Sequence, residues 1–281
     1  DTTGAGDQYA AGFLFGLAQG RALDDCARLG AMAAAEVIGH YGPRPLVSLK
    51  DLAAETLTSA GHSVTVSDLY AQGFNPVAGA HDFTHRADPA RLDLGAEQAN
   101  AAHTAGFAPD VQAEIDKLMA SDFLLLQFPF WWYSVPAMLK GWIDRVFAYG
   151  VAYDFGRTWD RGVFTGRRAM LSFTTSAPPT SSLPDGRNGD LERTLWPLHA
   201  GVLALCGYDV LKPFVAHAVR WVDQARREAI LAEYRQRLLH IEHDQPLFFQ
   251  KLGDYGPDGR LKAGIEPRTP GQHRGPRLHL D

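Results

Sequence analysis

The chain has 281 residues, 46% of them hydrophobic, which is enough to build a substantial core. Its formal net charge of -5 argues against the basic surface of a nucleic-acid-binding protein. Two cysteines, Cys26 and Cys206, are too few for a disulfide framework, which favours a reducing, cytoplasmic location. The most apolar window, residues 123–139, is interrupted by Gln127, Ser134 and two prolines, so we expect no membrane span.

The amino-terminal residues carry the motif Asp-Thr-Thr-Gly-Ala-Gly-Asp, followed by an apolar pattern of helical spacing. Glycines let backbone amides at a helix start approach a phosphate, and Asp7 could accept the proton of an attacking hydroxyl. The motif resembles the carboxyl-proximal signature of PfkB/ribokinase-type sugar and nucleoside kinases. The resemblance covers about residues 1–47 and implies that Asp7 is a catalytic base. The residues that it implies for anion binding are Gly4, Ala5 and Gly6.

The kinase-like segment continues with a second expected helix over residues 24–38, which ends at Gly39. It corresponds only to the last portion of such a kinase. A phosphotransfer site also needs the sheet that precedes this motif in the family, so we expect kinase ancestry without kinase activity. The kinase nevertheless remains the alternative function.

The pattern changes from about Leu52 onward. A helix is expected over residues 53–59 and an alternating strand over residues 63–67. Residues 77–109 are polar and favour a long irregular excursion, and a helix should follow from Pro109 to Met119. The apolar run at residues 122–128 is typical of a fully buried strand. It breaks at Pro129, and a helix should begin after Pro136.

The second half of the chain repeats this alternation of strands and helices. We expect a buried strand over residues 169–175, a helix over 191–206, a short strand from Asp209 to Leu211 and a long helix over 223–240. Such alternation predicts an α/β fold with a doubly wound parallel sheet. We therefore divide the chain into a kinase-like helical segment (1–47), an α/β domain (48–254) and a loose tail (255–281).

An aromatic motif follows the strand at residues 122–128, at the end where open parallel sheets bind their ligands. Its sequence, Phe-Pro-Phe-Trp-Trp-Tyr-Ser-Val-Pro, resembles the flavin-binding loop of FAD-dependent NAD(P)H:quinone oxidoreductases, the DT-diaphorase family of flavodoxin-like proteins. Asp68-Leu69-Tyr70 with Phe74-Asn75-Pro76 also matches this family, and the resemblance extends over about residues 52–250. The alternative is that the aromatic side chains belong to the core or to a dimer interface.

The resemblance implies hydride transfer from NAD(P)H through bound FAD to a quinone, with the cofactor supplying the chemistry. It implies two loops around the flavin ring, an aromatic one and a hydroxyl-rich one. The implied cofactor-binding residues are Pro129, Phe130, Trp131, Trp132, Tyr133, Thr174, Thr175, Ser176 and Ala177. The implied substrate-facing residues are Trp132, Tyr153, Phe155 and Leu205, the last one at a position that walls the partner subunit's pocket in the family. No metal ligand is implied.

The hydroxyl-rich loop departs from the family pattern. Ser176 and Ala177 stand where two glycines are usual, and prolines follow them. The family's best-studied members handle protons there with a Tyr and a His, and the matching positions are Ser182 and Asn188. Neither side chain titrates near neutral pH. Both can hydrogen-bond, but they would not act as a Tyr–His proton relay. The resemblance implies Tyr153 and Asn188 as the catalytic positions.

A further departure concerns the first strand and the phosphate-holding loop of a flavodoxin-like domain, for which the sequence shows no match. Residues 46–49 are the one nearby candidate for a replacement strand. We therefore expect a sheet that lacks its first strand and binds FAD weakly, because phosphates need amides, hydroxyls or cations to offset their lost hydration. A hybrid scaffold with no working cofactor site is the second alternative.

Three expectations concern other surfaces. The apolar residues around 140–147 and 195–206, together with the family's two-fold symmetry, predict a homodimer. Arg226 or Arg227 could meet the adenosine end of the cofactor. His240 and His243 share one helix face, but without a third ligand we expect solvent exposure rather than a metal site.

Overall fold

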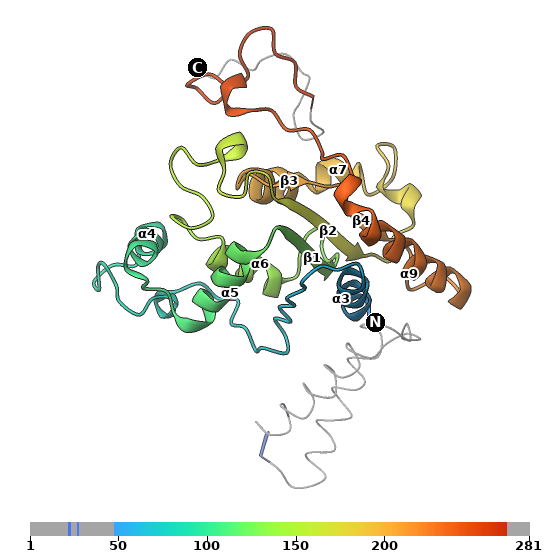
Figure 1. The fold of residues 1–281 in the computed structure, drawn as a ribbon, viewed down its shortest axis with the longest axis horizontal. Coiled ribbons are helices and arrows are strands. Elements are labelled where there is room, and N and C mark those ends of the chain that lie inside the picture. Colours follow the sequence, from blue (N-terminus) through green and yellow to red (C-terminus); the bar gives the residue numbers. More distant parts are fainter. Residues whose placement is uncertain (1–21, 24–26, 28–47, 269–281) are drawn as a thin grey trace. The chain divides into compact units, whose positions relative to one another are not determined.

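The computed structural model describes residues 22–23, 27 and 48–268 (Figure 1). The chain forms two compact units, Asp1–Ala53 and Ala54–Asp281. Helix α3, Leu49–Ser59, crosses the division between them and confirms the helix predicted over residues 53–59, with an earlier start. The kinase-like motif and the helix predicted over 24–38 lie outside the described residues. Every named element after α3 belongs to the second unit.

The centre of the second unit is a parallel sheet (Figure 1). Strand β1, Phe123–Pro129, pairs with β2, Arg168–Thr174, along its whole length, from Phe123 opposite Arg168 to Pro129 opposite Thr174. Strand β2 also pairs with β3, Asp209–Val210, near its start and with β4, Phe214–Ala216, near its end. The predicted parallel sheet is confirmed, and β2 is its central strand.

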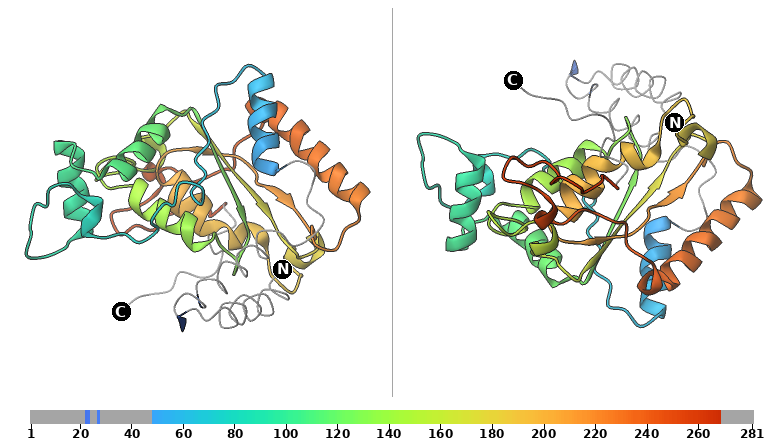
Figure 2. Two further views of the ribbon diagram at one scale, coloured as in Figure 1. Left: turned by 90° about the horizontal axis from the view of Figure 1, so that it is seen from below. Right: turned by 90° about the horizontal axis from the view of Figure 1, so that it is seen from above.

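Helices cover both faces of this sheet, as the α/β prediction requires. Figure 2 shows α5, Pro109–Ala120, and α6, Ala137–Val146, on one side of the strands and α9, Gln224–Leu239, on the other. Side chains alternate between the two faces along β2. Its fully buried Leu171 joins the cluster under α5 and α6, whereas the α9 residue Tyr234 packs on Phe214 and donates a hydrogen bond to Gln127.

The predicted helix over 191–206 forms in three pieces. Helix α7 covers Leu191–Thr194, α8 covers Trp196–Leu198, and a π-helical segment, η4, covers His199–Ala204. Pro197 lies in the first turn of α8, and a proline there cannot continue a hydrogen-bond ladder from the preceding helix.

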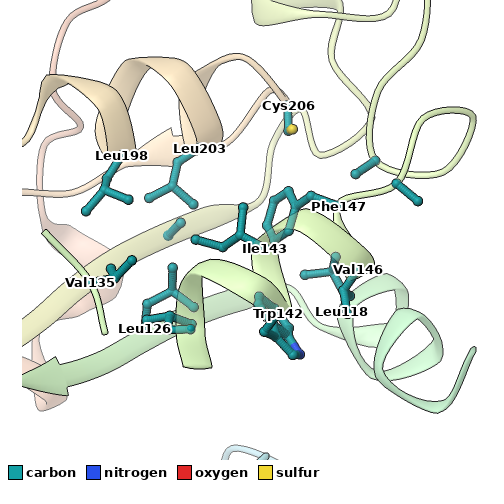
Figure 3. Close-up of a cluster of buried hydrophobic side chains, with 14 of the residues drawn as sticks. Leu118, Leu126, Val135, Trp142, Ile143, Val146, Phe147, Leu198, Leu203 and Cys206 are labelled. Carbon is teal, nitrogen blue, oxygen red and sulfur yellow. The ribbon is translucent and has the colours of Figure 1, made fainter. Parts of the chain in front are cut away.

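The apolar faces of this helical segment and of α6 meet each other. Figure 3 shows Leu198 and Leu203 pointing toward Ile143 of α6, and all three are buried in one core cluster. The core of the same chain therefore buries much of the apolar surface on which the predicted dimer interface was based. The homodimer remains a prediction that rests on the family resemblance.

The predicted strand over residues 63–67 is wrong. Residues 62–68 form no regular secondary structure and are mostly exposed, and β1 pairs with no described strand other than β2. An alternating pattern becomes a strand only where a neighbour can accept its ladder of hydrogen bonds. The proposed replacement strand over residues 46–49 does not form as such, because Leu49 already belongs to helix α3; its first two residues lie outside the described part of the chain.

The excursion over residues 77–109 is more ordered than expected. It contains a 3-10 turn, Ala80–Asp82, and helix α4, Leu94–Thr104, whose amino end is capped by the Asp93 carboxylate. Sequence periodicity missed α4 because its apolar residues are almost all alanines. The buried Glu97 of α4 accepts hydrogen bonds from Arg86 and from the backbone amides of residues 87 and 88.

A buried arginine fastens the excursion to α6. Arg145 is 1% exposed, and its guanidinium donates to Asp82 at 2.9 Å, to Asp110 at 2.9 Å and to the backbone carbonyl of Asn75 at 2.6 Å. It also lies over the ring of Phe74. These groups satisfy a charge that would otherwise be costly to bury.

The remaining elements largely follow the predictions. Asp223 caps α9, and β3 coincides with the strand predicted from Asp209. Strand β4 was not predicted. Residues 255–268, expected to be loose, contain a turn closed by a bridge between Tyr255 and Leu261, and residues 269–281 lie outside the described part. Within the described residues, no helix has the length and apolarity needed to cross a bilayer.

Candidate active site

A pocket lies at the carboxyl ends of β1, β2 and β4. Three segments line it: the aromatic loop after β1, the loop from Thr175 to Asn188 after β2, and the residues at the end of β4. The start of α7 closes it with Leu191 and Thr194. The structure thus brings together the two loops that the sequence predicted as neighbours, because Pro129 and Thr174 are paired at the last step of the β1–β2 register.

The floor of the pocket is a stack of aromatic rings. The Phe130 and Phe173 rings stack with their centroids 4.7 Å apart, and Phe128 continues the stack below Phe173 at 5.5 Å. Tyr133 meets Phe130 edge to face at 6.4 Å. The extended apolar surface of such rings suits a flat, conjugated ligand.

The aromatic loop is a tight turn with strained backbone. Trp131 and Ser134 exchange two backbone hydrogen bonds, and the residues between them, Trp132 and Tyr133, have φ values of 52° and 59°. A left-handed conformation costs a non-glycine residue on the order of 1–2 kcal/mol. The strain positions Trp132 at the rim, where its side chain is 96% exposed. Backbone strain kept in a pocket loop is a feature of functional sites.

The hydroxyl-rich loop is anchored by the end of β4 and by the residues that follow it. The Thr175 amide donates to the carbonyl of Ala216, and the Ala218 amide donates to the carbonyl of Ala177. The Thr175 hydroxyl accepts the Ala177 amide at 3.2 Å. The Ser176 amide has no hydrogen-bond partner among the described residues. This loop therefore offers a hydroxyl and a backbone N–H at the edge of the aromatic floor.

Asn188 and Ser182 also line the pocket. The Asn188 amide donates to the Ser181 carbonyl, which folds the intervening residues into a compact loop. The Tyr133 hydroxyl donates to Oδ1 of Asn188 at 3.3 Å, so the aromatic loop and the second loop are joined across the pocket.

His217 also lines the pocket, from the position directly after β4. Its Nδ1 lies 3.3 Å from the carbonyl oxygen of Ala177. Burial lowers the pKa of the imidazole, and the hydrogen bond to Ala177 opposes that shift. The sequence analysis missed His217, because the pattern of a three-residue strand is too short to identify the residue at its end.

The lining is electrically neutral near pH 7. The described residues contribute no Asp, Glu, Lys or Arg to it, and the titratable side chains among them are those of Tyr133 and His217. Such a surface can hydrogen-bond a polar ring, but it offers no fixed charge to a phosphate group.

Comparisons with known proteins place this architecture in a family. The family model described as the flavodoxin-like fold matches residues 37–241. NAD(P)H dehydrogenase [quinone] 1 of Cavia porcellus is 37% identical over 203 residues, 72% of this chain and 74% of that protein. Ribosyldihydronicotinamide dehydrogenase [quinone] of Homo sapiens is 37% identical over 213 residues, 75% of this chain and 92% of that protein.

Solved structures agree. A candidate quinone reductase from Klebsiella pneumoniae superposes with a TM-score of 0.77 at 33% identity, over 83% of this chain and 94% of that one. An NAD(P)H:quinone oxidoreductase from Methanothermobacter marburgensis, 23% identical, shares the fold with a TM-score of 0.53 over 71% of this chain and 92% of that one. The chain belongs to the flavodoxin-like quinone reductase family. The predicted fold and oxidoreductase class are confirmed at this level.

The amino-terminal segment of this quinone reductase family member matches a different model. The pfkB family carbohydrate kinase model covers residues 1–49. The motif predicted for the kinase function, with Asp7 as base and Gly4, Ala5 and Gly6 as anion-binding residues, lies outside the described residues.

The structure separates the predicted quinone reductase residues into two groups. The residues of the first group line the pocket: Phe130, Trp132, Tyr133, Thr175, Ser176, Ala177, Ser182 and Asn188. Three other predicted residues are not part of the lining, but each is a direct sequence neighbour of a lining residue: Pro129, Trp131 and Thr174. Tyr153, Phe155 and Leu205 do not line it. Tyr153 packs edge to face on Tyr149, and its pKa is raised, mainly by burial. Phe155 is 96% exposed.

The predicted residues at the cofactor's adenosine end are engaged locally. Arg226 pairs with Glu233 on the same helix, and Arg227 donates to the carbonyl of Val222. At the end of the same helix, the Nδ1 of His240 lies 2.7 Å from the carbonyl oxygen of Gln236. No group of three metal-binding side chains gathers within the described residues.

Proposed function

We propose that the chain is an NAD(P)H:quinone oxidoreductase that holds the ring of FAD in the pocket at the ends of β1, β2 and β4. The observation that carries the proposal is the stacked floor of Phe130 and Phe173 at the carboxyl edge of a parallel sheet. Ligands of open α/β sheets bind at this edge. The family membership supplies the reaction class.

The chemistry of the lining fits the ring half of FAD. The Thr175 hydroxyl, the Ser176 amide and the Asn188 side chain offer neutral hydrogen-bonding groups around an aromatic floor. The same lining does not fit the phosphate half, because it contains neither a cation nor a helix start of sufficient length. The pocket therefore supports recognition of the isoalloxazine ring, and it leaves the phosphates to be held by solvent or by other residues.

In this proposal each segment has a physical role. The bound flavin supplies the redox chemistry, accepting a hydride from NAD(P)H and passing it to a quinone. Phe130 and Phe173 support one face of the ring, and Trp132 at the rim limits the access of water to the other face. Thr175 and Ser176 orient the polar edge of the ring. The Tyr133–Asn188 hydrogen bond holds the two loops at a fixed separation.

We also propose that a second copy of the chain completes the substrate side of the pocket. Tyr153, Phe155 and Leu205 are the predicted substrate-facing residues that do not reach the pocket of their own chain. The Trp159 amide donates to the Leu205 carbonyl, which links the loop after residue 155 to the segment after η4. Phe155, almost fully exposed at a loop tip, has the exposure expected of a side chain that enters a partner's pocket.

The proposal is tested by titrating FAD into the 281-residue chain and following the absorbance of the flavin during addition of NADPH and then of a simple benzoquinone. We expect bleaching by NADPH and recovery with the quinone. Trp132→Ala should weaken FAD binding about tenfold, as expected for a lost aromatic contact of about 1.4 kcal/mol. Trp221→Ala is the matched control, since Trp221 is exposed and lies outside the pocket.

Other results of this experiment would support the alternative functions, the kinase or the hybrid scaffold. Phosphorylation of a nucleoside or sugar by ATP, without any flavin signal, would support the kinase function of the amino-terminal segment. Absence of both signals would support a hybrid scaffold without a working site. Equal FAD binding by Trp132→Ala and the unsubstituted chain would show that the ring lies elsewhere.

A further inference from the structure

His217 is placed in the pocket by backbone contacts on both sides of it. It follows Ala216, the last residue of β4, which is fully paired with the end of β2. The next residue, Ala218, donates its amide to the Ala177 carbonyl, the same oxygen that faces Nδ1 of the imidazole. The ring of His217 therefore has little freedom to leave the pocket.

The hydrogen bond to Ala177 determines the tautomer of the neutral imidazole. A carbonyl oxygen can only accept, so Nδ1 must carry the proton, and Nε2 then has the lone pair. Among the described residues, Nε2 has no hydrogen-bond partner. His217 thus combines a fixed orientation with one unsatisfied nitrogen in the pocket.

The surroundings of His217 contain few groups that titrate or carry charge. The floor contributes Phe173 and Val215, the loop after β2 contributes Ser176 and Ser182, and α7 contributes Leu191 and Thr194, none of which is ionisable. Tyr133 on the aromatic loop is the other titratable group of the lining. On the segment of His217 itself, the Arg220 guanidinium lies over the ring of Trp221, 5.1 Å from its centroid. Asp190, Glu192 and Arg193 at the start of α7 are not part of the lining.

His217 is therefore the one lining group whose ordinary pKa lies near neutrality. Burial holds its pKa below that value. The imidazole is neutral at pH 7 when its surroundings are neutral, and a negative charge placed beside it would raise its pKa and protonate it. No other lining group of the described pocket responds in this way near pH 7.

We propose that His217 holds the proton that the reaction consumes. The inference rests on the proposed function. Reduction of a quinone by NAD(P)H forms NAD(P)⁺ and a hydroquinone, and it uses one hydride and one proton. A flavin bound in the pocket would supply the hydride transfer, and in its reduced form it would place an added negative charge beside His217. His217 Nε2 takes a proton from solvent to balance this charge and gives it to the quinone oxygen when the hydride is passed on.

The test follows the imidazole directly, by NMR of the full chain carrying ¹³C-labelled histidine. The His217 signal is assigned by its loss in His217→Gln and His217→Asn. These amides keep a hydrogen-bonding group near Nε2 and Nδ1 respectively, so at least one variant should retain the fold. We expect a His217 pKa below 6.5 in the ligand-free chain. Addition of FAD reduced with dithionite should raise the pKa by at least about one pH unit, whereas oxidised FAD should not.

Kinetics provides the second readout. With a benzoquinone as substrate, kcat of the unsubstituted chain should fall as the pH rises through the raised pKa, because the proton donor is lost. Both His217 variants should show a kcat about a hundredfold lower, with no pH dependence in the same range. His243→Gln, the same chemical change at an exposed position outside the pocket, should keep the original profile.

The outcomes separate this inference from the proposed function. If FAD binds and is reduced but the pKa of His217 does not move, or the His217 variants keep the original pH profile, His217 does not hold the proton and the proposed function stands. If neither oxidised nor reduced FAD binds to the chain, the proposed function and this inference both fail.

Discussion

The two flanks of strand β1 differ sharply. On one flank, β1 is paired along its whole length with β2, and the ends of these strands carry a pocket with an aromatic floor. On the other flank, no described strand pairs with it, and residues 62–68, predicted as a strand, form no regular secondary structure. Burial reflects this difference, because the five central residues of β2 are all buried, whereas most residues of β1 are only partly buried.

The difference shows that the ring pocket does not depend on the unpaired flank. All of its lining comes from the paired flank and from α7. From the sequence, we predict that this chain lacks the loop after the first strand of a flavodoxin-like domain, which would hold the cofactor's phosphates. If the proposed function holds, recognition of the ring and recognition of the phosphates are separate features, and a substitution in the pocket should change the first without the second.

The largest effect is expected where the buried Arg145 joins α6 to Asp82 of the excursion that precedes β1. Arg145→Met should lower the free energy of unfolding by about 3–5 kcal/mol, because it leaves the buried Asp82 without its cation. Urea unfolding monitored by tryptophan fluorescence measures this. Arg157→Met, which removes an exposed ion pair with Asp154, is the control and should change stability by less than about 1 kcal/mol. Similar losses for the two variants would contradict the described network.

A pair of truncations compares the two flanks directly. Leu171→Ala removes a fully buried side chain from the central strand and should cost about 2–5 kcal/mol. Val66→Ala, in the unpaired segment, removes a side chain that is 44% exposed and should cost no more than about 0.5 kcal/mol. Thermal and urea unfolding give both values. A Val66→Ala cost as large as that of Leu171→Ala would mean that residues 62–68 are a packed strand.

The smallest effect is expected inside the pocket. Tyr133→Phe keeps the aromatic floor but removes the hydrogen bond to Asn188, so FAD binding should weaken by roughly fivefold, or about 1 kcal/mol. Fluorescence titration measures the Kd. Tyr70→Phe removes an exposed hydroxyl outside the pocket and should bind FAD as the unsubstituted chain does. Unchanged binding by Tyr133→Phe would show that the two loops keep their separation without this bond.

The sequence predicted the elements whose identity depends on local pattern. The apolar runs indicated β1 and β2 within one or two residues, and Asp223 marked the start of α9. Prediction failed where distant partners decide the structure. The alternation at residues 63–67 is a good strand pattern without a neighbour, and α4 is held by the Asp93 cap and the buried Glu97 rather than by an apolar stripe.

The candidate site also contains residues that local sequence pattern predicts and residues that only the tertiary structure reveals. The aromatic and hydroxyl-rich loops were predictable because each follows a strong strand pattern, and the register of β1 and β2 brings them together. His217 was not predictable, because it reaches the pocket through pairing of the very short β4 with β2. The separation of Tyr153, Phe155 and Leu205 from the pocket also depends on tertiary structure alone.

The central claim is that the pocket binds the ring of the cofactor and makes no contact with its phosphates, and comparing the affinities of riboflavin and FAD tests it most directly. Riboflavin and FAD are titrated separately into the same preparation of the 281-residue chain at one ionic strength. We expect both to bind, with Kd values that agree within about threefold, a difference below about 1 kcal/mol. Binding of FAD that is tighter than binding of riboflavin by about tenfold or more, or no binding of either, would contradict recognition through the ring alone.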